Sequence, residues 1–294
     1  MKKTLINSLC AVSVVAISQT ALASCDDIKA AAEAGGGLEA VANTVVSGNQ
    51  LANHSAANGG GFGLDMWVTA VDEKGVVCQV VNTARAKDEN KTIGANIGNK
   101  SWLGSRVISA QKANTANAFS LDGFSISTAN LYGLVQEGGS LYGLQHSNPV
   151  DTATAYKGAD KTGSAAKFGT AKDPLKGKAM GGVNVFGGGL ALYKSVTVGE
   201  TTSIVKVGAI GVSGDTSCTD HAVAWRIRTA LGLNTVPAGF NDLDGTNTSN
   251  LGDEMVIDTA DHLANNWAQP TCFTPPAEPA QGADNLNGVI DNTN

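Results

Sequence analysis

The stretch VGAIGVSGDTSCTDHAVAWRIR, residues 207–228, is the least random part of this chain and decides its fold class. Its first six residues are apolar or small, which predicts a buried strand. Gly214 then permits a sharp turn, and the polar residues that follow are of the kind that begin a helix. A final helix is expected from about Thr219, with an apolar stripe at Val223, Ile227, Ala230 and Leu231. The stretch therefore predicts a helix that leaves directly from the end of a sheet strand.

Further strands are predicted on the N-terminal side of this stretch. Residues 62–70 alternate between apolar and other side chains, residues 72–75 form a glycine-containing turn, and residues 76–81 return as a second strand. Two more strand-like runs lie at 183–186 and 190–193. Together with the run at 204–212, they predict a mainly antiparallel sheet of about five strands.

Helical periodicity marks three other segments. One helix begins at Leu38, a second spans about 102–120 with an alanine-rich inner face, and a short third follows Ser127. Residues 140–182 show little periodicity, and we interpret them as an inserted excursion that adds nothing to the core. The order of elements predicts an α+β fold in which helices cover the sheet.

The N-terminus has the pattern of a secretory signal peptide. Two lysines, an apolar run and a small-residue exit fill residues 1–23. The remaining chain divides into a small polar segment at 24–37, a domain at 38–233 and a polar extension at 234–294. We therefore expect an exported protein, periplasmic or secreted, with no membrane span. The formal net charge is −6, or −8 without the two signal lysines, which argues against nucleic acid as a partner.

Four cysteines remain after the signal, namely Cys25, Cys78, Cys218 and Cys272. An even count in an exported chain predicts two disulfides, with three possible pairings. A competing interpretation is that residues 22–25 form a lipobox and that Cys25 carries a lipid. Lipidation would leave an odd cysteine, so we favour the disulfides.

Four motifs occur in a fixed order: GLDMWVTAVDEKGVV at 63–77, QKANTANAF at 111–119, VFGGGLALY at 185–193 and VGAIGVSGDTSCTDHAVAW at 207–225. In this order they resemble the GlcG/HbpS-like haem-binding (haem-degrading) family and the C-terminal domain of PduO-type proteins. The resemblance covers roughly residues 38–233. It implies a profilin-like α+β fold, haem as a ligand and assembly into a homo-oligomer.

The turn after the last strand is a candidate ligand site. Free backbone N–H groups at a helix start favour anions, and haem propionates are one possibility. The plainer interpretation is that Asp215, Ser217 or Thr219 caps the helix internally. Asp220, Gly214 and His221 belong to the same turn. The positive helix end should keep His221 neutral, as an iron ligand must be, although a hydrogen bond to Asp220 is the competing role.

Basic residues supply the other candidates for ligand binding. Lys112 lies on the alanine-rich helix, where it could pair with a ligand carboxylate or perform covalent chemistry if buried. The plainer interpretation is that its side chain extends over small neighbours. Arg85 and Arg106 could also meet an acidic ligand, but we expect a solvated face for both. His54, His146 and His262 are expected to be surface or structural residues. Residues 241–247 partly resemble a calcium loop, but a polar surface loop fits their spacing better.

These observations leave three functions open. The first is an exported protein that binds haem or a similar small ligand. The second is an enzyme that degrades haem or acts on a small acid, although no catalytic set can be identified in the sequence. The third is a sensory or accessory module for a ligand other than haem, because a fold does not fix a function.

Overall fold

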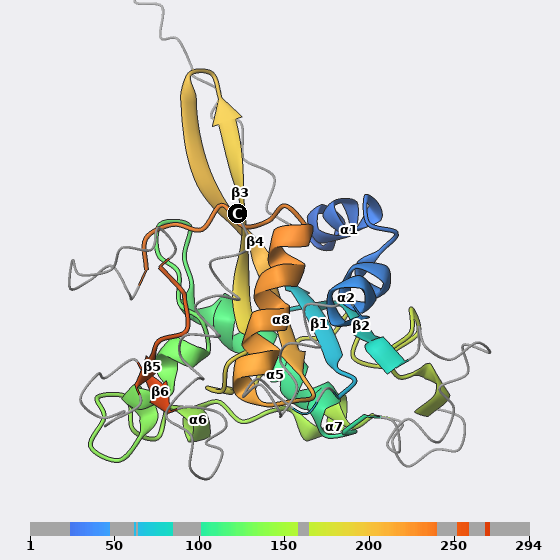
Figure 1. Cartoon of the computed structure of the whole chain (residues 1–294), viewed down its shortest axis with the longest axis vertical. Helices are drawn as coiled ribbons and strands as arrows, with labels where there is room; N and C mark the ends of the chain where they lie inside the picture. Colours follow the sequence, from blue (N-terminus) through green and yellow to red (C-terminus); the bar gives the residue numbers. More distant parts are fainter. Residues whose placement is uncertain are drawn as a thin grey trace, which may run out of the picture.

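The computed structural model describes residues 24–47, 62, 64–84, 101–157, 165–239, 252–258 and 268–270. A four-stranded antiparallel sheet, in the order β2-β1-β4-β3, lies between helices on both faces (Figure 1). The strands are β1 (Trp67–Asp72), β2 (Val77–Asn82), β3 (Gly189–Val198) and β4 (Thr201–Ser213). The longer helices are α1 (Cys25–Glu33), α2 (Leu38–Ser47), α5 (Ser105–Phe119) and α8 (Ser217–Ala230). The predicted α+β class is confirmed, and the architecture is compatible with a profilin-like fold.

Alternation along β1 explains why both faces of the sheet are covered. Val68 and Ala70 belong to the apolar cluster shared with α1, α2 and α8. Trp67 and Val71 belong to a second cluster, shared with α5. Successive side chains of a strand point to opposite faces of the sheet. Because β1 has apolar side chains on both faces, each face needs a layer of helices to cover it.

The alanine-rich face of α5 sits directly on the sheet. Ala110, Ala113 and Ala116 are almost fully buried. At Gly211 of β4, a Cβ atom would lie 2.0 Å from the carbonyl oxygen of Ser109, so helix and strand are in backbone contact. This close approach brings Lys112 next to β4.

The strand predicted at residues 183–186 is wrong. The Asn184 N–H donates to the Thr115 hydroxyl at 2.9 Å, and the Phe186 N–H donates to the Asn184 side-chain oxygen at 3.1 Å. The segment therefore bonds to α5 and to itself instead of to a neighbouring strand. Within the described residues the main sheet has four strands, and two-residue strands β5 (Ile257–Asp258) and β6 (Gln269–Pro270) form a separate parallel pair.

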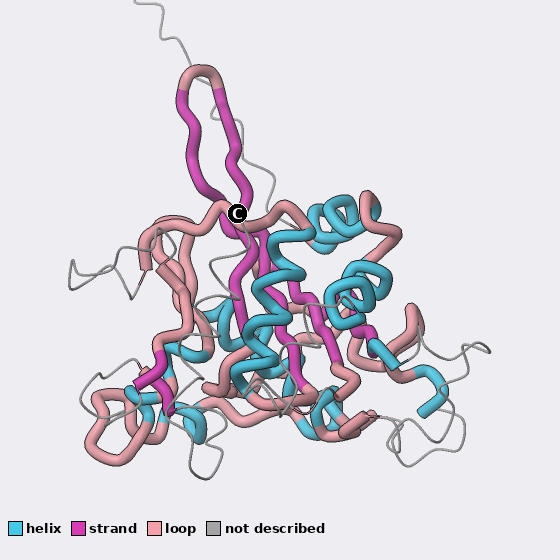
Figure 2. The backbone as a smooth tube through the Cα atoms, in the orientation of Figure 1, coloured by secondary structure: helices cyan, strands magenta, loops and turns pink. Residues whose placement is uncertain are grey.

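The β3–β4 hairpin projects from the body (Figures 1 and 2). Its residues near the turn are exposed, whereas the opposite ends of both strands are buried in the sheet. The hairpin turn is thus remote from the two helix layers.

The excursion at 140–182 contributes to the core, which corrects the earlier interpretation. Phe168, Leu175 and Met180 are buried against the face of the sheet that α5 covers. Arg106 of α5 holds the segment with two hydrogen bonds to the Asp173 carboxylate, at 3.0 Å from Nε and 2.5 Å from Nη2. Arg106 is 2% exposed, so the expected solvated position is wrong as well.

The remaining described elements are short. The helix expected after Ser127 is two 3-10 turns, η3 (Ala129–Leu131) and η4 (Gly133–Val135). The excursion carries α6 (Leu144–Ser147), α7 (Thr152–Ala155) and η5 (Ala165–Lys167). None of them forms part of the sheet.

The segment at 24–37, expected to be small and polar, forms α1 and packs on the sheet. Ser24 caps the helix, and Ile28 and Ala32 are buried.

Cys25 and Cys78 form a disulfide, which occupies the sulfur that a lipid thioether would need. Cys218 is also disulfide-bonded. Cys272 and the signal-like residues 1–23 lie outside the described residues. Among the residues that the structure does describe, no helix is both long and apolar enough to cross a bilayer.

Candidate functional site

A hollow of about 310 Å³ opens where the start of α5 meets the turn between β4 and α8. Three segments that are distant in sequence contribute to it: residues 102–112, Phe186, and residues 213–220. Its lining residues are Trp102, Ser105, Ile108, Lys112, Phe186, Ser213, Asp215, Ser217 and Asp220. Two of the predicted site residues, Lys112 and Asp220, therefore lie on the same hollow.

Lys112 and Asp220 form a buried ion pair in the wall of the hollow. The Lys112 ammonium lies 2.7 Å from Asp220 Oδ2 and also donates to the Val212 carbonyl oxygen at 3.0 Å. Both side chains are at most 3% exposed. The lysine is therefore a paired cation and offers no free amine for covalent chemistry.

Burial acts against the charge on both members of this pair. It raises the pKa of Asp220 to about 6, although Lys112 pulls that pKa down. It also lowers the pKa of Lys112, an effect that the Asp220 carboxylate opposes. Water is excluded from both groups, so each charge is stabilised mainly by the other.

The first turn of α8 is capped from within the protein. The Thr216 hydroxyl accepts from the Thr219 N–H, and Asp220 Oδ1 accepts from the Asp215 N–H at 3.0 Å. Gly214 is required here because a Cβ atom would lie 2.7 Å from the Asp65 carbonyl oxygen. The cap is Thr216, which was not among the residues predicted for it (Asp215, Ser217 or Thr219), but internal capping accounts for the turn without a bound anion.

Asp215 has a structural task at the same turn. Its carboxylate accepts hydrogen bonds from the N–H groups of Phe62, Leu64 and Thr216, at distances between 2.6 and 3.0 Å. These bonds hold the residues that precede β1 against the start of α8. The wall of the hollow is thereby fixed by contacts across about 150 residues of sequence.

Aromatic side chains form the exposed part of the hollow. Trp102 is 53% exposed and Phe186 is 50% exposed, unusually high values for large apolar residues. The Trp67 indole N–H donates to the Trp102 carbonyl oxygen at 3.0 Å, which fixes the backbone there. With Ile108, these residues give the hollow an apolar rim.

His221 lies behind this wall and does not line the hollow. Its side chain is buried, and neither ring nitrogen has a hydrogen-bond partner in the part of the chain that the structure describes. Burial, together with the charges of Arg228 and Lys112, lowers its pKa to about 3. The ring is neutral, as expected from the sequence. The cause differs, because the sequence pointed to the positive end of the helix, whereas burial is the main cause of the lowered pKa.

A segment of the C-terminal extension encloses His221. Met255 packs with Cys218 and Ala222, which flank His221 on α8. A Cβ atom at Gly187 would lie 2.2 Å from Met255 Cε and 3.2 Å from His221 Cβ, so all three are in close contact. The imidazole is therefore covered by residues 187 and 255 in this structure.

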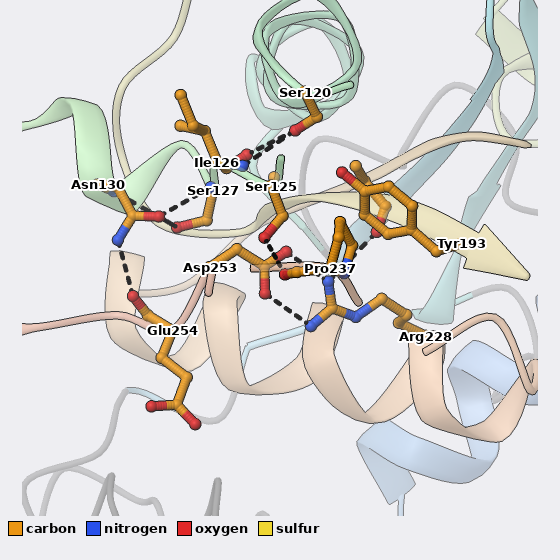
Figure 3. A network of polar contacts seen from close by, with 12 residues as sticks. Ser120, Ser125, Ile126, Ser127, Asn130, Tyr193, Arg228, Pro237, Asp253 and Glu254 are labelled. Carbon is orange, nitrogen blue, oxygen red and sulfur yellow. Dashed lines mark hydrogen bonds and ion pairs between the residues drawn. The ribbon is translucent and has the colours of Figure 1, made fainter. Parts of the chain in front are cut away.

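Buried polar contacts fix this covering segment (Figure 3). The Arg228 guanidinium makes two hydrogen bonds to the Asp253 carboxylate, at 2.6 and 3.0 Å, and it also donates to the Ala191 carbonyl. The Asn130 side-chain amide donates to the Glu254 carbonyl at 2.7 Å. Residues 252–258 are thus an integral part of the fold around α8.

Other predicted residues are placed as follows. Arg85, His54, His262 and the calcium-like loop at 241–247 lie outside the described residues, and His146 is exposed. The glycine run at 187–189 is a place of close backbone approach: at Gly188, with φ +114°, a Cβ atom would lie 2.5 Å from the Val212 carbonyl oxygen.

Sequence reasoning missed the apolar rim of the hollow. Trp102 was noted only as the start of a helix and Phe186 only as part of a strand. The sequence signal was weak, because a short sequence pattern does not show whether an aromatic residue is exposed or buried.

Haem fits this site only in part. The rim can contact a flat apolar macrocycle, and ligand pockets are mostly apolar with a few polar groups. An iron ligand from the protein would be His, Cys, Met or Tyr, and none of these is among the described lining residues. The arrangement therefore suits a planar ligand but does not supply a bond to iron.

Comparison with known proteins gives few similarities. No family model matches the chain, and no curated protein matches it. Among solved structures, the Klebsiella pneumoniae protein ORFY of the DUF336 family is 20% identical with a TM-score of 0.34, covering 65% of this chain and 88% of that one. A PduOC:haem complex is 18% identical with a TM-score of 0.33, covering 63% and 88%. At these values neither structure assigns a family or a ligand to this chain.

Proposed function

We propose that this chain is an exported protein that binds a small, planar, largely apolar ligand in the hollow between α5 and α8. Tetrapyrroles such as haem are the ligand class to test first, because the four ordered motifs resemble a haem-binding family. The proposal is carried by one observation: three separate segments bring two half-exposed aromatic residues and a buried polar wall to one hollow of about 310 Å³.

The physical basis is the surface that a ligand would remove from water. Aromatic faces bind planar rings by offset or edge-to-face contact, and they contribute a large apolar area. Ligand pockets are concave, and most of the surface that lines them is apolar or aromatic, as it is in this hollow. A volume of about 310 Å³ is at the lower end for ligand pockets, so one edge of a macrocycle enters while the remainder lies over the rim.

Export is supported by the chain itself. Residues 1–23 have the pattern of a signal peptide. The Cys25–Cys78 disulfide persists in oxidising compartments such as the periplasm or the extracellular space, and it is rare in the cytosol.

The test is a titration with haemin and, in parallel, with iron-free protoporphyrin IX. We expect both to bind saturably and with similar affinity, because no described lining residue ligates iron. Trp102→Ala should weaken both about tenfold, a typical loss when an aromatic contact at a binding site is removed. Tyr142→Ala is the matched control, since Tyr142 is 70% exposed and does not line the hollow.

Two results would overturn the proposal. One is a flat titration with folded protein for both porphyrins. The other is equal binding by the Trp102 and Tyr142 variants, which would place the ligand elsewhere.

A further inference from the structure

The charged groups of the hollow restrict the chemistry of its ligand. We infer that the site accepts a ligand whose inserted end is neutral or cationic and rejects one whose inserted end is a carboxylate or phosphate. This inference rests on the proposed function, and it names the ligand class that the same hollow selects.

The first reason is that the lysine of the hollow is already used. The Lys112 ammonium bonds to Asp220 and to the Val212 carbonyl, and its side chain is 2% exposed. A ligand carboxylate would have to displace Asp220 from a 2.7 Å contact and leave that carboxylate buried without its partner. Removing one partner from a buried pair costs several kcal/mol, about 3–5 in measured cases.

The second reason is that some of the N–H donors at the helix end are also used. The N–H groups of Asp215, Thr216 and Thr219 already donate to protein oxygens. A helix start attracts anions through unsatisfied N–H groups, and these three N–H groups at the turn already have partners. A propionate would therefore find little of the attraction that the sequence suggested.

The third reason is the charge that remains. Among the described lining residues there are two carboxylates, Asp215 and Asp220, and one ammonium, Lys112. The net charge of these lining side chains is therefore −1, and it lies beside the aromatic faces of Trp102 and Phe186. Aromatic faces attract cations, and a like charge in a partly dry site is unfavourable. A porphyrin would therefore insert its apolar edge and keep its propionates in water.

The experiment compares two probes that share an indole ring and a two-carbon linker. Tryptamine ends in an ammonium and indole-3-propionate ends in a carboxylate. We expect tryptamine to bind at least tenfold more tightly in calorimetric or NMR titrations at pH 7.5. Repeating the titrations in 0.5 M salt reduces the long-range effect of the net negative chain.

A variant tests whether the preference is local. Ile108 lines the hollow one helical turn before Lys112 and is partly exposed, so Ile108→Lys adds an unpaired cation without disturbing the buried pair. We expect this variant to reduce the preference for tryptamine at least tenfold or to reverse it. Ile108→Met keeps the apolar contact and should retain the wild-type preference.

A second measurement covers the case in which both indoles bind too weakly. Conversion of both propionates of protoporphyrin IX to amides should leave its affinity unchanged or higher. Equal or tighter binding of indole-3-propionate, or a tenfold loss with the porphyrin diamide, would overturn the inference while leaving the proposed site intact. Failure of every indole and porphyrin to bind would instead overturn the proposed function, and the inference with it.

Discussion

Replacing Lys112 with methionine tests how the wall of the hollow is held together. The change removes the ammonium 2.7 Å from Asp220 and leaves the Val212 carbonyl without that donor. Asp220 keeps the Asp215 N–H as a partner, but its charge is then buried and unpaired. Breaking a buried pair in this way costs about 3–5 kcal/mol, so we expect that loss in the free energy of unfolding at pH 8.

The loss should depend on pH in a defined direction. The folded-state pKa of Asp220 is about 6, above the unfolded value of about 3.9, and Lys112 is what keeps it from rising further. A carboxyl with a raised folded pKa binds its proton more tightly when folded, so stability increases as pH falls through that pKa. In the variant the pKa lies higher still, so the loss should shrink by at least about 1 kcal/mol between pH 8 and pH 5.

Urea unfolding of four proteins at both pH values provides the assay. They are the wild type, Lys112→Met, Asp220→Asn and the double variant, which carries no buried charge at the pair. We expect the double variant to recover most of the loss, with a coupling energy above about 2 kcal/mol. A single-variant loss below about 1 kcal/mol at pH 8, or strictly additive losses, would show that the two groups do not depend on each other.

Three other changes test the elements around the site. Arg228→Met leaves the buried Asp253 carboxylate unpaired and should cost about 3–5 kcal/mol, with earlier proteolysis within residues 252–258; unchanged proteolysis would contradict the role given to this pair. Replacing both Cys25 and Cys78 with serine opens a link between residues 53 positions apart, and the loop-entropy relation gives a loss of about 4 kcal/mol in urea unfolding; a loss under about 1 kcal/mol would argue against it. Gly188→Ala should cost at least about 2 kcal/mol, because a Cβ atom would meet the Val212 carbonyl oxygen, whereas Gly199→Ala, with positive φ but open space around it, should cost about 1 kcal/mol; equal losses would remove the steric argument.

Periodicity predicted the elements that carry the fold. The alternating run before residue 72 became β1, the alanine-rich segment became α5, and the opening stretch became β4 and α8. These patterns are local, because the side chains of a helix or a strand return to the same face within a few residues. Lys112 and Asp220 were predicted as site residues from two separate motifs, and the structure places them in direct contact.

Long-range pairing is what the sequence did not indicate. Arg106 was expected to be solvated, but its partner Asp173 lies 67 residues further along the chain. Asp215 was one of three residues expected to cap the last helix, but Thr216 is the cap and Asp215 holds Phe62 from 153 residues away. The cover over His221 comes from Met255 in the extension. None of these partners has a fixed spacing, so only the folded chain identifies them.

The most direct test of the proposed site is an NMR titration of the ¹⁵N-labelled protein with iron-free protoporphyrin IX. Binding at the hollow should shift the Trp102 indole signal and the amide signals of Ser105, Ile108, Ser217 and Asp220. The amides at the exposed end of the β3–β4 hairpin, such as Val198, should not move. Saturable binding that leaves the signals of the hollow unchanged, or that shifts the hairpin instead, would contradict the assignment of the ligand site.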